Sequence, residues 1–242
     1  MNKYRPYISA STQNHNVGVG MFGTEQDRMM FLADRVKYWL STQGGKFNVF
    51  RNHPGMSLNE TIKDCNRLGC DSFTDNHTNA GISRAEGTET YYYGQAGRTS
   101  NSYKLASLLY KHIAPLSPGD DRGVKPDTSL YKSGLTVIQN TNPPAALIEH
   151  IFHTNRMEVK HFISHVDMYA IEEAKAVCEF YGEKWVETSK KKDISVSTLV
   201  NEMEKDGLIT SNEYWTKVLN GELVADPKYL QILFGRAIYK IN

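Results

Sequence analysis

The sequence has little cysteine and no long apolar run. Cys65, Cys70 and Cys178 are its three cysteines, and no second cysteine pair is present to complete a zinc ribbon. We interpret them as small buried apolar side chains. No segment approaches the ~20 apolar residues of a transmembrane helix, and no apolar stretch of signal-peptide length follows residues 1–6. We therefore expect a soluble protein made in the cytoplasm, which needs a separate release route if it acts outside the cell.

Charge of one sign is also lacking. Lys and Arg number 28 against 27 Asp and Glu, a formal net charge of +1. This balance argues against binding to nucleic acid or to a membrane surface, both of which a strongly basic protein would favour. Membrane insertion is not expected either, because no apolar run is long enough. The first 165 residues are modestly positive and residues 166–242 modestly negative, which favours a domain boundary near residue 165. The hydrophobic fraction of 40% is ample for a packed core.

Short apolar runs alternate with stretches of helical periodicity in the first domain, residues 1–165. This pattern predicts an α/β fold, in which helices flank a sheet and chemistry gathers where loops leave strand ends. Strands are expected at 7–9, 47–50, 71–75, 88–93, 135–138 and 145–148. Helices are expected at 24–41, 57–68 and 101–113.

The last 77 residues change character, because no strand pattern is convincing there. Helical spacing predicts a small all-α module over 166–242, with helices at 167–182, 195–205, 210–219 and 227–241. Its aromatic and aliphatic side chains leave four interpretations open. They pack internally, or one face of the module is covered by the first domain, by a second copy of the chain in a homodimer, or by an insoluble polymer.

Four side chains lie near expected strand ends or a helix start: His15, Glu25, His77 and Glu149. Two imidazoles and one carboxylate are a common ligand set for a hydrolytic zinc ion with an open position. A further carboxylate could then serve as general base. Spacing alone does not separate this reading from ordinary loop side chains.

Five short motifs favour the metal site over ordinary loop side chains. They are Gly23-Thr24-Glu25, His77-Thr78-Asn79-Ala80, Gly87-Thr88-Glu89, Arg122-Gly123-Val124-Lys125 and Pro144-Ala145-Ala146-Leu147-Ile148-Glu149. In this order, across residues 7–163, the sequence resembles the zinc-dependent N-acetylmuramoyl-L-alanine amidases of the amidase-3 type, found in autolysins and phage endolysins. The resemblance implies a twisted, mostly parallel sheet flanked by helices, of the phosphorylase/hydrolase-like kind. It also implies peptidoglycan as the substrate.

The resemblance further implies a site. One Zn²⁺ would be held by His15, Glu25 and His77, with Glu149 as general base. Asn79 and Arg122 would contact substrate, although anchoring of its own loop is an equal alternative for Arg122. Absence of a signal peptide favours a phage endolysin released through a membrane lesion over a secreted autolysin.

One motif departs from the family pattern. The family has Asp-Pro-Gly-His-Gly after the first strand, whereas this chain has a longer loop, residues 9–16, with His15 as the only histidine before Glu25. A wall-binding protein without metal is therefore kept as an alternative. A zinc peptidase of similar sheet architecture, which would cut a peptide bond, is a second alternative. Of the histidines that follow Glu149, His153 is considered as a proton donor.

Overall fold

The computed structural model describes residues 4–19, 23–187, 196–205 and 208–219. The chain forms two compact units, Met1–Val186 and Glu187–Asn242, which are described separately. In the part of the chain described, no helix is both long and apolar enough to cross a membrane.

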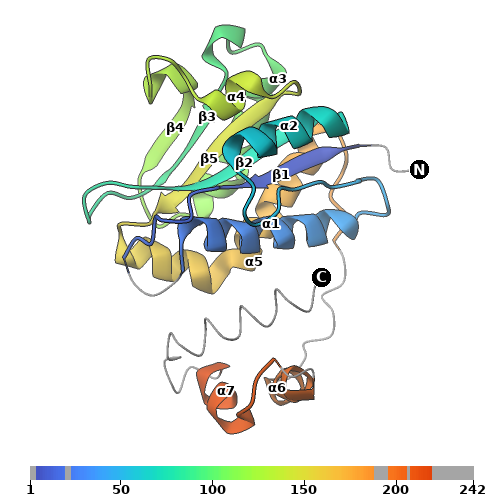
Figure 1. The fold of residues 1–242 in the computed structure, drawn as a ribbon, viewed down its shortest axis with the longest axis vertical. Helices are drawn as coiled ribbons and strands as arrows, with labels where there is room; N and C mark the ends of the chain where they lie inside the picture. Colours follow the sequence, from blue (N-terminus) through green and yellow to red (C-terminus); the bar gives the residue numbers. More distant parts are fainter. Residues whose placement is uncertain (1–3, 20–22, 188–195, 206–207, 220–242) are drawn as a thin grey trace. The chain divides into compact units, whose positions relative to one another are not determined.

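Five described strands of the first unit form one sheet (Figure 1). They are β1 (Pro6–Ala10), β2 (Ser72–Asn79), β3 (Thr88–Tyr92), β4 (Asp121–Pro126) and β5 (Ala145–Phe152). The order across the sheet is β1-β2-β5-β3-β4. Only the β3–β5 pair is antiparallel, so the predicted mostly parallel sheet is confirmed.

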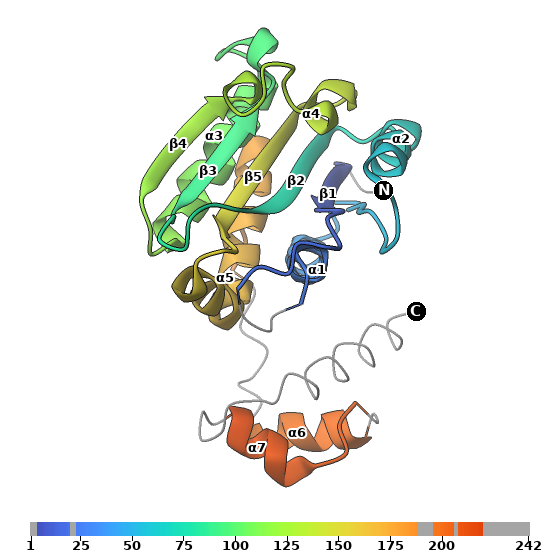
Figure 2. The same ribbon diagram turned by 60° about the vertical axis from the view of Figure 1, so that its left-hand side comes forward.

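Helices cover both faces of this sheet (Figure 2). They are α1 (Glu25–Ser41), α2 (Leu58–Leu68), α3 (Asn101–Ile113), α4 (Thr136–Asn140) and α5 (Arg156–Phe180). Short 3₁₀ turns lie at Gly94–Ala96, Ala114–Leu116 and Asp127–Ser129. The larger hydrophobic cluster lies under α1, α3 and α5, and the smaller one under α2 and α4.

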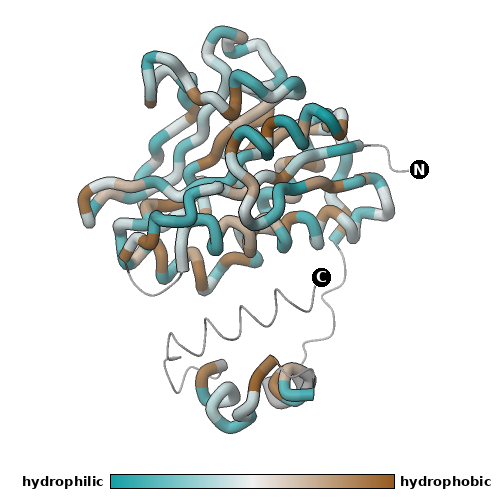
Figure 3. Tube along the Cα trace, in the orientation of Figure 1, coloured by the Kyte–Doolittle hydropathy of each residue, from teal (hydrophilic) through white to brown (hydrophobic). Residues whose placement is uncertain are grey.

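Local sequence explains the helix boundaries. Thr24 and Asp27 form a capping box at the start of α1, and Ser57 and Glu60 form another at α2. Gly69 ends α2 in the left-handed conformation, which glycine adopts without steric cost. Hydrophilic and hydrophobic residues alternate along these helices, so one side of each faces the core (Figure 3). All three cysteines are free and buried, as predicted.

Three segments differ from the sequence prediction. The predicted strand at 135–138 is wrong, because Thr136–Asn140 is helix α4. Its Val137 and Ile138 are buried in the same hydrophobic cluster as α2. An apolar run this short can be buried as a strand or as a helix, so its periodicity does not distinguish the two. Residues 47–50 make only two isolated bridges, to Tyr4 and Tyr7. The Arg-Gly-Val-Lys segment, expected as a loop, forms the edge strand β4.

The first unit extends beyond the predicted boundary at residue 165. The single helix α5 runs through that position, with non-helical backbone angles at His165 only. Tyr169 and Phe180, assigned by sequence to the second module, belong to the large cluster of the first unit. The division therefore falls between Val186 and Glu187.

The second unit contains two described helices, α6 (Val196–Lys205) and α7 (Asn212–Leu219), close to the predicted ranges. Val200, Ile209 and Trp215 are buried together and form its small core. The predicted helix at 227–241 lies outside the described residues.

Candidate functional site

Strand register places three polar side chains in a row across the middle of the sheet. His77 of β2 pairs with Glu149 of β5, and Glu149 pairs with Glu89 of β3. Neighbouring strands are about 4.8 Å apart, so these side chains are neighbours. The register shifts between His77 and Asn79, a bulge-like irregularity of the kind often found beside functional sites.

The same face changes from apolar to polar along each central strand. On β2 the alternate residues are Phe73, Asp75 and His77, and on β5 Leu147 precedes Glu149. Helices α2 and α4 pack on the apolar part. A hollow of about 320 Å³ opens beside His77, with Asp75, Leu147 and Tyr131 in its lining. The polar part of the face is thus accessible from outside.

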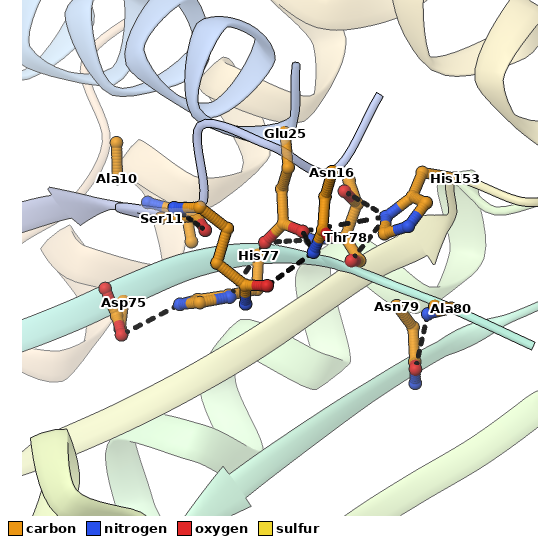
Figure 4. A network of polar contacts seen from close by, with 12 residues as sticks. Ala10, Ser11, Asn16, Glu25, Asp75, His77, Thr78, Asn79, Ala80 and His153 are labelled. Carbon is orange, nitrogen blue, oxygen red and sulfur yellow. Dashed lines mark hydrogen bonds and ion pairs between the residues drawn. The ribbon is translucent and has the colours of Figure 1, made fainter. Parts of the chain in front are cut away.

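Glu25 reaches this row from the start of α1 (Figure 4). One carboxylate oxygen, Oε1, lies 2.9 Å from His77 Nδ1. The other, Oε2, accepts a hydrogen bond from Asn16 Nδ2 at 3.1 Å. Burial alone would raise the pKa of Glu25, but the bond to His77 and its charge outweigh burial and lower the pKa to about 2. Glu25 is therefore a buried carboxylate held in its charged form.

His77 lies between two carboxylates. Its Nε2 is 3.1 Å from Asp75 Oδ2, two residues earlier on the same strand. Burial would lower the pKa of His77, but Asp75 and Glu25 together raise it well above the ordinary value. A carboxylate on one ring nitrogen fixes the tautomer and leaves the other nitrogen directed at Glu25, as is typical of metal-binding histidines.

Glu149 is buried with one oxygen, Oε2, that has no hydrogen-bond partner within the described structure. Burial raises its pKa to about 8, against the positive charge of His77. The nearby carboxylates of Glu25, Glu89 and Asp75 raise it further. Glu25 and Asp75 thus place two charged carboxylates beside one imidazole, with the carboxyl group of Glu149 next to them, and a cation would be favoured there.

Glu89 is buried and neutralised by cations. Lys125 Nζ bonds to its Oε2, and Arg122 Nε lies 3.2 Å from the same atom. Burial would raise the pKa of Glu89, but these cations, Lys125 first, lower it. Asn79 donates to Oε1 of the same carboxylate. Of the two predicted substrate contacts, Arg122 also lies over the Phe152 ring at 4.8 Å. In the described geometry, then, both side chains anchor Glu89.

The predicted metal ligands are only partly brought together. Glu25 and His77 are in contact, whereas His15 is exposed and makes no side-chain bond to either of them. Among the described residues, no three His, Cys, Asp or Glu side chains form a group arranged to hold a metal ion. Glu25 and His77 nevertheless suit one, since ligands ~2.0–2.1 Å from a tetrahedral zinc lie about 3.3 Å apart. The unpartnered Glu149 oxygen supports the same reading.

Two contributors, Asp75 and Lys125, were missed by sequence reasoning, and for His153, which was considered only as a proton donor, the contact with Glu25 was not foreseen. Asp75 could have been found, because it stands two residues before His77 and so shares its face of the strand. Lys125 stands in a motif quoted above, but only the β3–β4 pairing brings it to Glu89. His153 Nδ1 lies 3.6 Å from Glu25 Oε2, a contact between elements more than a hundred residues apart that no local pattern predicts.

Several solved structures share this fold. An N-acetylmuramoyl-L-alanine amidase from Clostridium difficile 630 is 23% identical, with a TM-score of 0.65 over 76% of this chain and 100% of that one. The catalytic domain of the amidase CwlV from Bacillus (Paenibacillus) polymyxa is 25% identical, with a TM-score of 0.64 over the same shares. The catalytic domain of the CD27L endolysin, which targets Clostridia difficile, is 19% identical, with a TM-score of 0.59 over 73% of this chain and 97% of that one.

Sequence comparison points the same way. Over 140 residues the chain is 30% identical to the uncharacterized protein YqiI of Bacillus subtilis (strain 168), a match that spans 57% of this chain and 64% of that relative's length. Residues 10–179 match the N-acetylmuramoyl-L-alanine amidase family. That range contains all five motifs and every site residue described above. The chain therefore belongs to the N-acetylmuramoyl-L-alanine amidase family.

Proposed function

We propose that this protein is a zinc-dependent peptidoglycan hydrolase that cleaves the amide between N-acetylmuramic acid and L-alanine. The observation that carries this proposal is the buried Glu149, with a free oxygen, beside the Glu25–His77 pair. Membership of the amidase family and an open polar sheet face support it.

In this proposal Glu25 and His77 bind the metal through the carboxylate and Nδ1, while Asp75 orients the imidazole from the other side. Zinc, when bound, supplies Lewis-acid polarisation of the scissile carbonyl and lowers the pKa of a nearby water. Metal binding requires His77 to give up the proton that Glu25 and Asp75 now favour. Zinc affinity should therefore rise with pH.

Glu149 acts as the general base. Its free Oε2 accepts a proton from the attacking water and later returns it to the alanine nitrogen as the amide breaks. Burial and the neighbouring carboxylates raise the pKa of Glu149, and a cation held at Glu25 and His77 would lower it again and favour the carboxylate form that accepts a proton. The hollow of about 320 Å³ beside His77, bordered by the exposed ring of Tyr131, offers a place for part of the substrate.

The test is twofold. Mass spectrometry of fragments released from purified walls identifies the bond that is cut, and free alanine amino termini with intact glycans are expected. Metal analysis should find one zinc per chain in the wild type and much less in His77→Ala. Cleavage of a peptide bond instead would mean a zinc peptidase, and absence of cleavage would mean a wall-binding protein.

For the second unit we propose one of two roles. It either holds the enzyme on the wall or joins two copies of the chain into a homodimer. An enzyme that attacks an insoluble polymer gains rate by staying bound to it. Truncation after Val186 should leave hydrolysis of soluble muropeptides nearly intact and slow the lysis of whole walls, with oligomeric state measured by light scattering. Truncation after residue 165 should abolish folding, because it removes the buried part of α5. If the chain ending at Val186 lysed whole walls as fast as the full-length chain, the second unit would not be a targeting device.

A further inference from the structure

The hollow beside His77 combines apolar and neutral polar groups. Apolar side chains form one part of its lining: Leu58, Val137 and Leu147. Side chains with amide or hydroxyl groups form another part: Gln13, Ser133 and Thr136. Its volume of about 320 Å³ lies at the low end of the ~300–1,000 Å³ of small-molecule sites. The hollow therefore suits one compact ring better than a stretch of polymer.

The charges around the hollow favour a neutral ligand. Its charged lining consists of Asp75 and His77, which face each other at 3.1 Å. Neither Lys nor Arg occurs among the described residues that line it. Arg122 and Lys125 belong instead to β4, which β3 separates from β5 in the sheet. An acidic ligand would thus find its cations on the β4 side, and the hollow remains for an uncharged one.

Tyr131 borders the hollow on a loop with a fixed backbone. Its N–H donates to Asp127 O at 3.4 Å, and its carbonyl accepts from Gly134 N at 2.7 Å. The Asp127 carboxylate is completely buried and accepts from Gly94 N at 2.9 Å and from Leu135 N at 3.1 Å. A side chain at Gly134, where φ is +73°, would collide with this carboxylate, so the turn requires glycine. The loop therefore holds Tyr131 in one place.

The ring of Tyr131 is 59% exposed, although the loop that carries it is tightly bonded. An exposed tyrosine ring offers a flat apolar surface with a polar tip, and few torsions must be ordered when a ligand covers it. The face of a pyranose ring such as N-acetylglucosamine consists of C–H groups, whereas its polar groups lie around the edge. A sugar can therefore stack on Tyr131 while its edge bonds to the amide and hydroxyl groups of the hollow.

We infer that the hollow binds a sugar ring of the glycan strand and that Tyr131 holds this ring by stacking on it. The inference rests on the proposed function, in which the scissile amide joins a neutral glycan to an acidic stem peptide. The glycan occupies the hollow, and the peptide extends toward Arg122 and Lys125, where its carboxylates meet cations. Tyr131 thereby makes the enzyme prefer an amide attached to a sugar over an ordinary peptide bond.

The experiment measures the binding of two ligands that each represent one side of the scissile amide. The sugar ligand is the disaccharide of N-acetylglucosamine and N-acetylmuramic acid, with its lactyl group capped as the methylamide to keep it neutral. The peptide ligand is the stem peptide with a lactoyl cap and no sugar. Dissociation constants are measured by NMR of the ligand signals in Glu149→Gln, which should bind both ligands without rapid cleavage.

In this parent, Tyr131→Ala should weaken binding of the sugar ligand on the order of tenfold, and that of the peptide ligand by less than about twofold. Tyr131→Phe keeps the ring and should retain the sugar affinity of the parent. Leu130→Ala is the matched control, since Leu130 is 41% exposed on the same loop but does not line the hollow. It should change neither constant. Melting temperatures should stay unchanged because both side chains are exposed.

Steady-state kinetics with Glu149 restored give a second readout on a disaccharide peptide. Stacking that is equal in the ground and transition states predicts a higher KM for Tyr131→Ala with kcat unchanged. Sugar binding that is absent or independent of Tyr131, or weaker binding of the peptide ligand instead, would overturn the inference and leave the amidase proposal standing. Sugar binding that depends on Tyr131, in a wild type that cuts no wall amide, would overturn the proposed function and keep the hollow as a sugar site.

Discussion

The two faces of the central strands carry two different polar clusters, one beside an open hollow and one completely buried. On one face His77 contacts Glu25, borders an open hollow and pairs across the strands with Glu149, which has an oxygen without a partner among the described residues. On the other face, the adjacent residues His150 and Asn76 are completely buried under α5. There His150 Nε2 lies 2.7 Å from Asn76 Oδ1.

Asn76 also donates to Glu173 of α5 and to the Ser9 carbonyl, both at 3.1 Å. This network ties β1, β2, β5 and α5 together, and its ring partners Phe162 and Tyr169 exclude water. Side chains alternate between the two faces of a strand, so His77 and Glu149 lie on the open face while their neighbours Asn76 and His150 lie on the buried face. Changes on the open face should affect turnover, and changes on the buried face should affect stability.

The largest effect is expected for Glu149→Gln on the open face. The amide cannot accept the proton of water, so turnover on muropeptides should fall by about 10²–10⁴-fold. The zinc content and the melting temperature should be kept, since the change removes no hydrogen bond made by the free Oε2. Retention of more than about a tenth of the activity would assign the base to another group.

Asn76→Ala is the matched change on the buried face. It leaves His150 Nε2 and Glu173 Oε1 without their partner, and each buried unsatisfied group costs ~1–3 kcal/mol. We expect the free energy of unfolding in urea to fall by about 2–5 kcal/mol. Turnover per folded molecule, measured well below the melting temperature, should stay within severalfold of the wild type. A larger loss of turnover than of stability would contradict the separation of the two faces.

The buried face should also make stability depend on pH. Burial raises the pKa of Glu173 to about 8, although the bond from Asn76 opposes the shift. The folded chain therefore holds a proton that the unfolded chain releases above pH ~4.5. The contribution of Glu173 to stability is complete below that pH and is lost as pH rises towards 8.

Glu173→Gln stays neutral and should remove this part of the decline, stabilising the protein at pH 8.5 by about 1–3 kcal/mol and little at pH 4.5. The pKa of Glu149 is raised as well, so the stability of both proteins also changes with pH for that reason. The measured quantity is therefore the difference in unfolding free energy between the wild type and Glu173→Gln at each pH. Parallel curves would show that Glu173 is charged in the fold.

The smallest effect on stability is expected for Arg122→Ala. Its pair with Glu89 is partly exposed, and such pairs contribute ~0–1 kcal/mol. If Arg122 also binds a substrate carboxylate, as the sequence prediction proposes, KM for a muropeptide should rise on the order of tenfold with kcat unchanged. The same KM in the variant would mean that Arg122 only anchors Glu89.

Local sequence was sufficient for features that depend on neighbouring residues. Helical spacing predicted a helix from residue 24 to residue 41, and α1 begins at Glu25, whose side chain is buried. Motif spacing likewise picked out His77 and Glu149, although both lie inside longer strands than expected, β2 and β5. The α/β class followed from alternation of apolar runs.

Features that depend on distant pairing were not accessible in this way. The row of Glu89, Glu149 and His77 exists only because of the β3–β5–β2 register. His153 joins Glu25 through tertiary packing alone, and the apolar run at 135–138 fits a strand or a short helix equally well. The predicted boundary at residue 165 coincides with the non-helical backbone of His165, a kink in α5 where the packing nevertheless continues.

The position of the site within the sheet has a consequence for local opening. His77, Glu149 and Glu89 lie on the three inner strands, whose amides are expected to exchange with deuterium only when the whole unit unfolds. Residues 11–19 form an irregular loop, a class of segment that opens locally at a lower free energy than core strands, and they supply Asn16 to Glu25 and cover His153. Metal binding should thus slow exchange chiefly in this loop. The protein would then keep half of its site permanently formed and complete the other half when the ion arrives.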